Sequence, residues 1–219
     1  MSIAADEFQI AGRSYGIDEH GVLCQVDPQS FQYSEEYVSR YDNPEYRENE
    51  KKLSAIRLEF CKASLGRDIV SLYDLGYGNG AFLRHARGEV SLLYGYDAAE
   101  LEVPGVTQSV DTTMNVDVLT MWDVLEHISD LSFLDGIGAE MIAVTVPYCH
   151  WRTEGIGWVE SEYIHLKPDE HVRHFDPDSL AETMRSHGWR NIALCNSEDV
   201  VRTSRHLLAN TFTSAYVRG

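Results

Sequence analysis

The feature that most constrains this chain is a glycine-rich segment behind a short hydrophobic run. The run of residues 69–72 leads to Asp74, and glycines then occupy alternate positions: Gly76, Gly78 and Gly80. Alternate glycines let a backbone turn sharply with its amides uncovered, so a polar ligand can lie against the main chain. A dinucleotide-binding loop has the spacing G-x-G-x-x-G without an obligatory acid before it. An acid before the first glycine would repel a pyrophosphate, and it favours a ligand that carries an ammonium group.

This segment resembles motif I of the class I methyltransferases that use S-adenosylmethionine, and the resemblance extends over residues 69–195. In that family the glycine loop passes under the amino-acid part of the cofactor, and the acid accepts a hydrogen bond from its ammonium group. The resemblance therefore assigns cofactor binding to Asp74, Gly76, Gly78 and Gly80. Tyr77, where the family more often has a small residue or cysteine, would narrow this pocket and belongs to the same site. A nicotinamide dinucleotide is the alternative ligand.

A second acid supports a nucleoside ligand. Residues 90–96 form an apolar run typical of a buried strand, and Asp97 follows it. An acid at the end of the second strand of a βαβ unit, about 20 residues past the glycines, is placed to accept hydrogen bonds from the ribose hydroxyls of an adenosine. We assign Asp97 and the adjoining Ala98 to the cofactor site. In the alternative interpretation, Asp97 only caps the next segment.

A third segment combines a predicted strand with a further motif. Residues 116–122 are apolar, and the sequence Asp-Val-Leu-Glu-His that follows resembles a signature of small-molecule and tailoring methyltransferases. By that resemblance, Trp122 and Asp123 lie at the carboxyl end of the strand beside the cofactor. The alternative is a core aromatic residue followed by a helix-capping aspartate. His127 is a candidate general base because imidazole titrates near neutrality, and it could equally be structural.

The resemblance implies a Rossmann-like, doubly wound α/β fold with a mostly parallel seven-stranded sheet. Helices are expected over 44–65 and 81–87, and a short strand over 106–110. Asp111, which follows that strand, is a candidate for the adenine edge. Two closing strands, over 191–195 and 210–217, would form an antiparallel edge hairpin. Between them, Arg202 and Arg205 are expected to be solvated.

The amino-terminal residues 1–43 are predicted to be an extension of the domain, which would occupy residues 44–219. Residues 8–26 alternate apolar and polar groups around two turn-like sites, a pattern that predicts a β-hairpin. Tyr33, Tyr37 and Tyr41 recur at helical spacing and form either a lid over the cofactor or a packing face.

Composition excludes several other classes. The 219 residues suffice for one α/β core, so we expect a single globular domain. The formal charge of −17, from 35 acids against 18 bases, disfavours a nucleic acid partner. Four separated cysteines form no C-x-x-C pair. No apolar run could span a membrane and the start lacks the pattern of a secretion signal, so a cytoplasmic location is expected and no membrane partner.

Histidines are concentrated in residues 148–175, the loop region that forms the acceptor pocket in the family resembled. His150 and His171 join His127 as candidate general bases. His165, His171 and His174 could in principle surround zinc together with Cys149 or His150, but their spacings match no zinc pattern. We therefore predict no metal site.

The implied reaction is an in-line attack of an acceptor atom on the sulfonium methyl of S-adenosylmethionine. Positioning dominates such a reaction, and a base helps only where the acceptor must lose a proton. We expect a hydroxyl, amine or similar acceptor on a small molecule or glycan, with a protein acceptor left open and the oligomeric state undetermined. The alternative is a methyltransferase-like scaffold or assembly protein without activity, because fold does not secure function.

Overall fold

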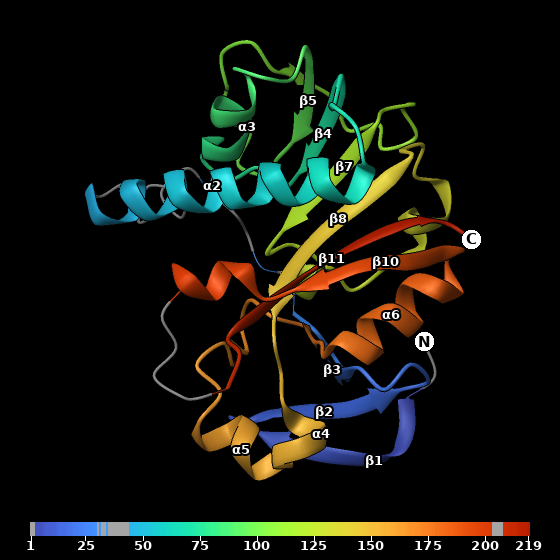
Figure 1. Cartoon of the computed structure of the whole chain (residues 1–219). Helices are drawn as coiled ribbons and strands as arrows, with labels where there is room; N and C mark the ends of the chain where they lie inside the picture. Colours follow the sequence, from blue (N-terminus) through green and yellow to red (C-terminus); the bar gives the residue numbers. More distant parts are fainter. Residues whose placement is uncertain (1–2, 30, 32–33, 35–43, 203–207) are drawn as a thin grey trace.

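The computed structural model describes residues 3–29, 31, 34, 44–202 and 208–219. Its main feature is a seven-stranded sheet with the order β10-β11-β8-β7-β4-β5-β6 (Figure 1). All pairings are parallel except those of β11, which is antiparallel to both neighbours. The strands are β4 (Ser71–Leu75), β5 (Leu92–Tyr96), β6 (Thr107–Gln108), β7 (Val118–Trp122), β8 (Met141–Pro147), β10 (Trp189–Cys195) and β11 (Thr211–Arg218). The predicted fold class and its antiparallel edge hairpin are confirmed.

Helices on both faces explain why the central strands are buried throughout. Every residue of β7 and β8 is buried, as expected for parallel strands that are covered on two sides. Successive side chains alternate between the faces, so Leu72 packs under α2 (Pro44–Leu65) and α3 (Ala81–Ala86). Tyr73 points to the opposite core, which α6 (Pro177–Ser186) covers (Figure 1).

The start of α6 follows the sequence signals for a helix. Asp176 Oδ1 accepts a hydrogen bond from Ser179 N at 2.8 Å, and Ser179 Oγ accepts one from Asp176 N at 3.0 Å. This reciprocal capping box satisfies two amides at the helix start, and Pro177 occupies the first position, where no amide is needed. The predicted helices over 44–65 and 81–87 are also present, the second one residue shorter.

A second, smaller sheet contains the predicted amino-terminal hairpin. It consists of β1 (Ile3–Ile10), β2 (Arg13–Asp18), β3 (Leu23–Gln25) and β9 (Arg173–His174), in that order and antiparallel throughout. The short helices α4 (Trp151–Glu154) and α5 (Ile156–Ser161) lie beside it (Figure 1). Tyr15, Cys149 and Val159 share its hydrophobic core. The amino-terminal strands therefore hold the segment that follows β8.

Other expectations require correction or lie outside the described residues. The strand expected over 106–110 is only two residues long, and residues 97–117, all described, contain no helix. The remaining elements are short 3₁₀ turns: η1 (Leu125–His127), η2 (Ser132–Gly136) and η3 (Ser197–Val200). The tyrosine lid, at residues 33, 37 and 41, and Arg205 lie outside the described residues. Among the described residues, no helix is long and apolar enough to cross a membrane.

Candidate functional site

A cavity of about 570 Å³ opens where β4, β5, β7 and β8 end. In open α/β sheets, ligands bind outside the carboxyl ends of the strands, and this volume is ordinary for a small-molecule site. The structure brings most of the predicted site residues into its wall. These are Asp74, Gly76, Tyr77, Gly78, Asp97, Ala98, Trp122, Asp123, His127 and His171. Gly80, Asp111 and His150 do not line it.

All three glycines of the loop have a positive φ, at which another residue would be strained. Gly76 has φ +74°, and a Cβ there would lie 2.5 Å from Val124 Cγ2. Gly78 has φ +54°, but a Cβ would meet no atom within 4 Å. The loop at Gly78 is therefore open for a ligand to approach the backbone. Gly80 has φ +77° and precedes α3, and a Cβ there would lie 2.3 Å from Val103 Cγ2.

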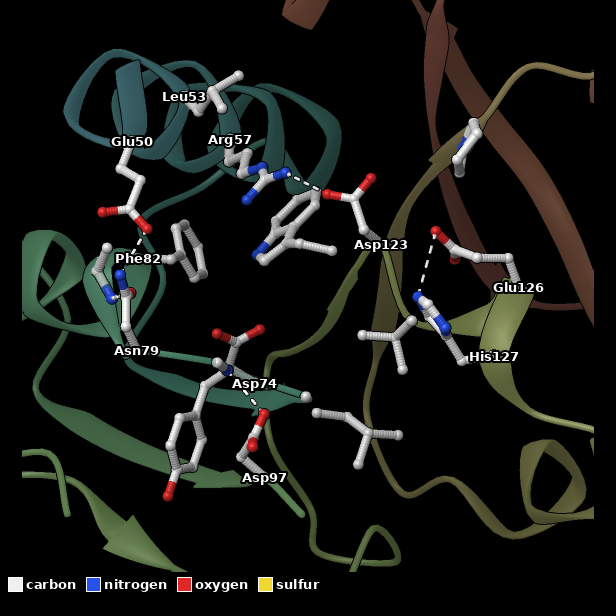
Figure 2. Close-up of a pocket in the computed structure, with 18 of the residues that line it drawn as sticks. Glu50, Leu53, Arg57, Asp74, Asn79, Phe82, Asp97, Asp123, Glu126 and His127 are labelled. Atoms are coloured by element: carbon white, nitrogen blue, oxygen red, sulfur yellow. Dashed lines mark hydrogen bonds and ion pairs between the residues drawn. The ribbon is translucent and has the colours of Figure 1, made fainter. Parts of the chain in front are cut away.

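Asp74 is a buried carboxylate with an unused acceptor. Its side chain is fully buried and points into the cavity (Figure 2). Oδ1 accepts a hydrogen bond from Thr120 Oγ1 at 2.6 Å, whereas Oδ2 has no partner among the described residues. Burial raises the pKa of Asp74 to about 7, against the lowering effects of Thr120 and Arg57. A buried acceptor of this kind favours a cationic ligand group such as an ammonium.

Asp97 ties the end of β5 to the glycine loop. Its Oδ2 accepts from Gly78 N at 2.7 Å and its Oδ1 from Ala99 N at 2.8 Å (Figure 2). It therefore caps a turn, as the alternative interpretation held, and it also lines the cavity. Because a carboxylate oxygen accepts more than one hydrogen bond, capping leaves capacity for ligand hydroxyls.

The neighbouring phenol leaves the cavity open. Tyr77 lies in the wall with its hydroxyl donating to Leu101 O at 2.6 Å. The expected role of Asp111 at the adenine edge is not supported. Its exposed carboxylate accepts from Thr113 N and Oγ1, outside the cavity, because the two-residue strand β6 leaves this segment at the sheet edge.

An ion-pair network crosses the middle of the cavity. Asp123 has φ +58°, unusual for a residue other than glycine, and its carboxylate accepts two hydrogen bonds from Arg202, at 2.9 and 2.5 Å. Arg57 from α2 donates to Asp123 at 3.2 Å (Figure 2), and it also donates to Glu198 at 2.8 Å. Burial alone would raise the pKa of Asp123, but Arg202 and Arg57 hold it well below its usual value. The expectation that Arg202 is solvated is wrong.

Trp122 forms a flat wall next to this network. Its ring contacts Phe82 edge-on, with centroids 5.3 Å apart, and the Arg57 guanidinium lies 4.9 Å above it. The indole Nε1 is buried without a partner among the described residues. Trp122 therefore combines an apolar face with an unused donor at the cavity.

The opposite end of the cavity is lined by titratable side chains: Glu126, His127, His165, Lys167 and His171. Glu126 is 2% exposed, and neither carboxylate oxygen has a hydrogen-bond partner from another described residue. The rings of His127 and His171 meet edge-on with centroids 4.6 Å apart. Burial lowers the pKa of His127, and lowers that of His171 to about 2, so both imidazoles are neutral at pH 7.

His150 is not available as a base for a ligand in this cavity. Its Nε2 is bonded to Ala209 O at 2.8 Å, and its ring stacks on Tyr148 with centroids 3.7 Å apart. Sequence reasoning also missed Arg57, Glu126 and Arg202 as cavity residues. Glu126 belongs to the Asp-Val-Leu-Glu-His motif, directly before His127, whereas no local pattern marks the two arginines.

A comparison with protein families identifies the domain that contains this cavity. A family model described as a methyltransferase domain matches residues 44–194. None of the curated proteins searched matches the chain.

Solved structures of similar fold share little sequence identity with the chain. An S-adenosylmethionine-dependent methyltransferase from Mesorhizobium loti is 12% identical, with a TM-score of 0.52 over 73% of this chain and 96% of that one. Magnesium protoporphyrin IX methyltransferase from Synechocystis PCC 6803 with bound SAH is 14% identical, with a TM-score of 0.50 over 88% and 90%. The [4+2]-cyclase SpnF is 14% identical, with a TM-score of 0.52 over 77% and 81%. At these identities the likeness shows the fold alone, and the chemistry must be argued from the site.

Proposed function

Because the chain belongs to the methyltransferase-domain family, we propose that it transfers a methyl group from S-adenosylmethionine to an acceptor on a small molecule or glycan. The observation that carries the proposal is the buried, unpartnered Oδ2 of Asp74 beside an open glycine loop. A buried acceptor next to uncovered backbone suits a ligand that carries an ammonium group close to polar atoms. The acidic surface argues against a nucleic acid acceptor.

The residues of the glycine end would hold the cofactor. Asp74 would accept a hydrogen bond from its ammonium group, and Asp97 would accept from the ribose hydroxyls. Gly78 allows close approach of the ligand to the loop, and the face of Trp122 offers apolar contact. When bound, S-adenosylmethionine supplies an electrophilic methyl group on a sulfonium.

The opposite end of the cavity would hold the acceptor. His127 and His171 line it, and both are neutral. His127 would be the better acceptor of a proton from an acceptor hydroxyl or amine, because a pKa of about 2 makes His171 a weak base. Asp123 remains ionised between two arginines and would fix the width of the cavity between its two ends. Residues 1–43 would form an extension of a domain that spans residues 44–219.

Calorimetry with S-adenosylmethionine tests cofactor binding directly. Asp74→Asn keeps the shape and the hydrogen bond to Thr120 but removes the negative charge, so we expect the affinity to fall at least about tenfold, the equivalent of roughly 1.4 kcal/mol. Asp97→Ala should also weaken binding. Asp111→Ala is the matched control, because this acid lies outside the cavity, and it should bind as the wild type does.

An absence of binding at millimolar cofactor would refute the proposal and favour the scaffold alternative. Equal affinity of Asp74→Asn and wild type would refute the role of Asp74. The acceptor itself can be sought by incubating metabolite extracts with the protein and a cofactor that carries a labelled methyl group.

A further inference from the structure

The histidine end of the cavity contains a set of groups that cofactor binding leaves unused. One carboxylate oxygen of Glu126 and one ring nitrogen each of His127 and His171 lie within 4.8 Å of one another. We propose that Glu126, His127 and His171 bind a divalent transition-metal cation. This differs from the prediction of no metal site, which rested on sequence spacing.

The burial of Glu126 is the first argument. Its side chain is 2% exposed, and neither oxygen has a hydrogen-bond partner from another described residue. An ionised carboxylate in such a place is strongly disfavoured unless a cation or a proton neutralises it. Glu126 is therefore a buried acceptor without a hydrogen-bond donor from another described residue, and it lies beside two imidazoles.

The orientation of His127 is the second argument. Its Nδ1 lies 2.9 Å from Glu170 O, and because a carbonyl only accepts, the proton of the neutral ring is on Nδ1. Nε2 then carries the lone pair, and it lies 3.9 Å from Glu126 Oε1 (Figure 2). Metal-binding histidines commonly donate their other ring N–H to a backbone carbonyl in this way, which sets the tautomer and aims the lone pair at the metal.

His171 completes the set from a distant part of the chain. It is 3% exposed, and its Nδ1 has no partner among the described residues. Two backbone contacts hold it in place: Val172 N donates to Glu126 O at 2.8 Å, and Gln25 Nε2 donates to His171 O at 3.1 Å. The first contact joins the two ligand-bearing segments directly. The three side chains are thus positioned by the fold around one point.

The distances are compatible with one ion after a small adjustment. Donor atoms about 2.1 Å from a tetrahedral ion are about 3.4 Å apart, so side-chain movements of about an ångström would close the site. Lys167 also lines the cavity, and its Nζ lies 3.6 Å from Glu170 Oε2, which offsets its charge. Asp123 is itself neutralised by Arg57 and Arg202.

The donor set indicates which metals fit. Two imidazoles and one carboxylate suit Zn²⁺, Mn²⁺, Fe²⁺ or Co²⁺, whereas Mg²⁺ and Ca²⁺ prefer oxygen ligands alone. Three protein ligands leave at least one coordination position open, as in catalytic metal sites. Since all three residues line the cavity, that position faces the space where the acceptor would lie.

A consequence for the acceptor follows, and it rests on the proposed function. A bound cation lowers the pKa of a hydroxyl that reaches it, which favours an oxygen acceptor over an amine. The hydroxyl would release its proton to solvent, and its oxygen would form a bond to the methyl carbon. The carbon–sulfur bond would break with its electron pair passing to sulfur, giving the methyl ether and a neutral thioether.

Metal binding is testable without cofactor or acceptor. The full chain is stripped with a chelator and titrated by calorimetry with ZnCl₂, MnCl₂ or MgCl₂, and CoCl₂ binding is followed by its visible absorption. We expect one equivalent of Zn²⁺ or Co²⁺ to bind and Mg²⁺ to bind much more weakly. Glu126→Gln and His171→Gln should each lower the affinity by at least about tenfold, the smallest loss seen when even outer partners of a metal are removed.

His187→Gln is the matched control, because His187 also pairs with a carboxylate, Asp135 at 2.7 Å, but lies outside the cavity. It should bind metal as the wild type does, and circular dichroism checks that each variant is folded. The proposal is overturned if no saturable binding occurs, or if folded Glu126→Gln binds with unchanged affinity. Metal binding without cofactor binding would refute the proposed function alone, and the reverse result would refute the metal site alone.

Discussion

The two ends of the cavity each contain a fully buried carboxylate, but the carboxylates are held differently. Asp74, at the glycine end, has one hydrogen bond from Thr120 and one unused oxygen. Glu126, at the histidine end, has no hydrogen bond from another described residue and faces two neutral imidazoles. The glycine end suits a single hydrogen-bond donor of a bound molecule. The histidine end suits an ion that several side chains coordinate.

Between them, Asp123 shows what a carboxylate does when its partners are already in place. Two arginines hold its pKa well below the usual value, whereas burial raises the pKa of Asp74 to about 7. Three acids in one cavity thus differ in charge because of their neighbours and not because of their type. Substitutions that remove the partners of these carboxylates, or the carboxylates themselves, test this comparison.

The largest effect is expected from Arg202→Met, which removes one cation from the central network. Glu198 is 1% exposed and would keep Arg57 alone as a cationic partner among the described residues. Removing one partner of a buried ion pair costs about 3–5 kcal/mol of unfolding free energy. Urea denaturation measures this loss. Arg185→Met, which breaks an exposed ion pair with Glu182, should cost less than about 1 kcal/mol. Equal losses of stability in the two variants would mean that the central ion pairs contribute no more than an exposed pair does.

Gly76→Ala should destabilise the protein more than Gly78→Ala does. The new Cβ would contact Val124 at 2.5 Å, which costs about 1–3 kcal/mol, in addition to about 1 kcal/mol for an alanine at positive φ. Gly78→Ala carries the backbone cost alone, because no protein atom lies within 4 Å. Thermal unfolding should therefore separate the two variants. A larger loss of stability for Gly78→Ala would contradict the observed loop geometry.

The pH dependence of cofactor binding tests Asp74. Below pH 7 its carboxyl is mostly protonated in the free protein and must lose the proton to pair with an ammonium group. The affinity should therefore rise between pH 5 and 7, by up to about tenfold per pH unit, or about 1.4 kcal/mol. Arg57 and Asp97, the charged groups that act on Asp74, remain in the Asp74→Asn variant, whose affinity should not show this rise.

The raised pKa of Asp74 makes the ligand-free protein less stable as the pH rises, whereas it makes cofactor binding stronger. Because the folded-state pKa is raised, the folded state binds more protons than the unfolded state between about pH 4 and 7. The contribution of Asp74 to stability is present below that range and is lost as the pH rises through 7. Comparing wild type with Asp74→Asn by denaturation at pH 5 and 8 isolates it, and an affinity and a stability that changed in the same direction would contradict the assignment.

The smallest effects are expected from changes to residues that hold the histidine end of the cavity in place. Gln25→Met leaves the carbonyls of Pro168 and His171 without their side-chain donor, which should cost about 1–2 kcal/mol and weaken metal binding. Asp169→Ala breaks the neighbouring exposed pair with Arg13 and should cost less than about 1 kcal/mol. Unchanged metal binding in Gln25→Met would show that the small sheet does not position His171.

The predictability of the site differs between its two ends for a physical reason. Asp74, the glycines, Asp97, Trp122 and Asp123 are close to strand ends, and parallel strands place their carboxyl ends together. A local pattern is then enough to bring such residues to one cavity. His150, by contrast, lies two residues beyond the isolated bridge between Tyr148 and Phe175, and the chain has already turned away from the cavity there.

Errors elsewhere arose from contacts between distant segments. Arg202 follows a stretch whose polar sequence predicts exposure. It nevertheless pairs with Asp123, which lies at the end of β7. Asp111 follows a strand that is too short to carry it to the cavity. No residue near either position signals these outcomes.

The sequence by itself determined the α/β fold, the glycine loop and the carboxylates at the ends of β4 and β5, because strand periodicity and the need for positive φ are local properties. Only the tertiary structure decided that β9 joins the amino-terminal sheet and that Val172 bonds to Glu126, which brings His171 to His127. These contacts join residues more than 40 positions apart, and their energy comes from burial and backbone pairing that no short segment contains.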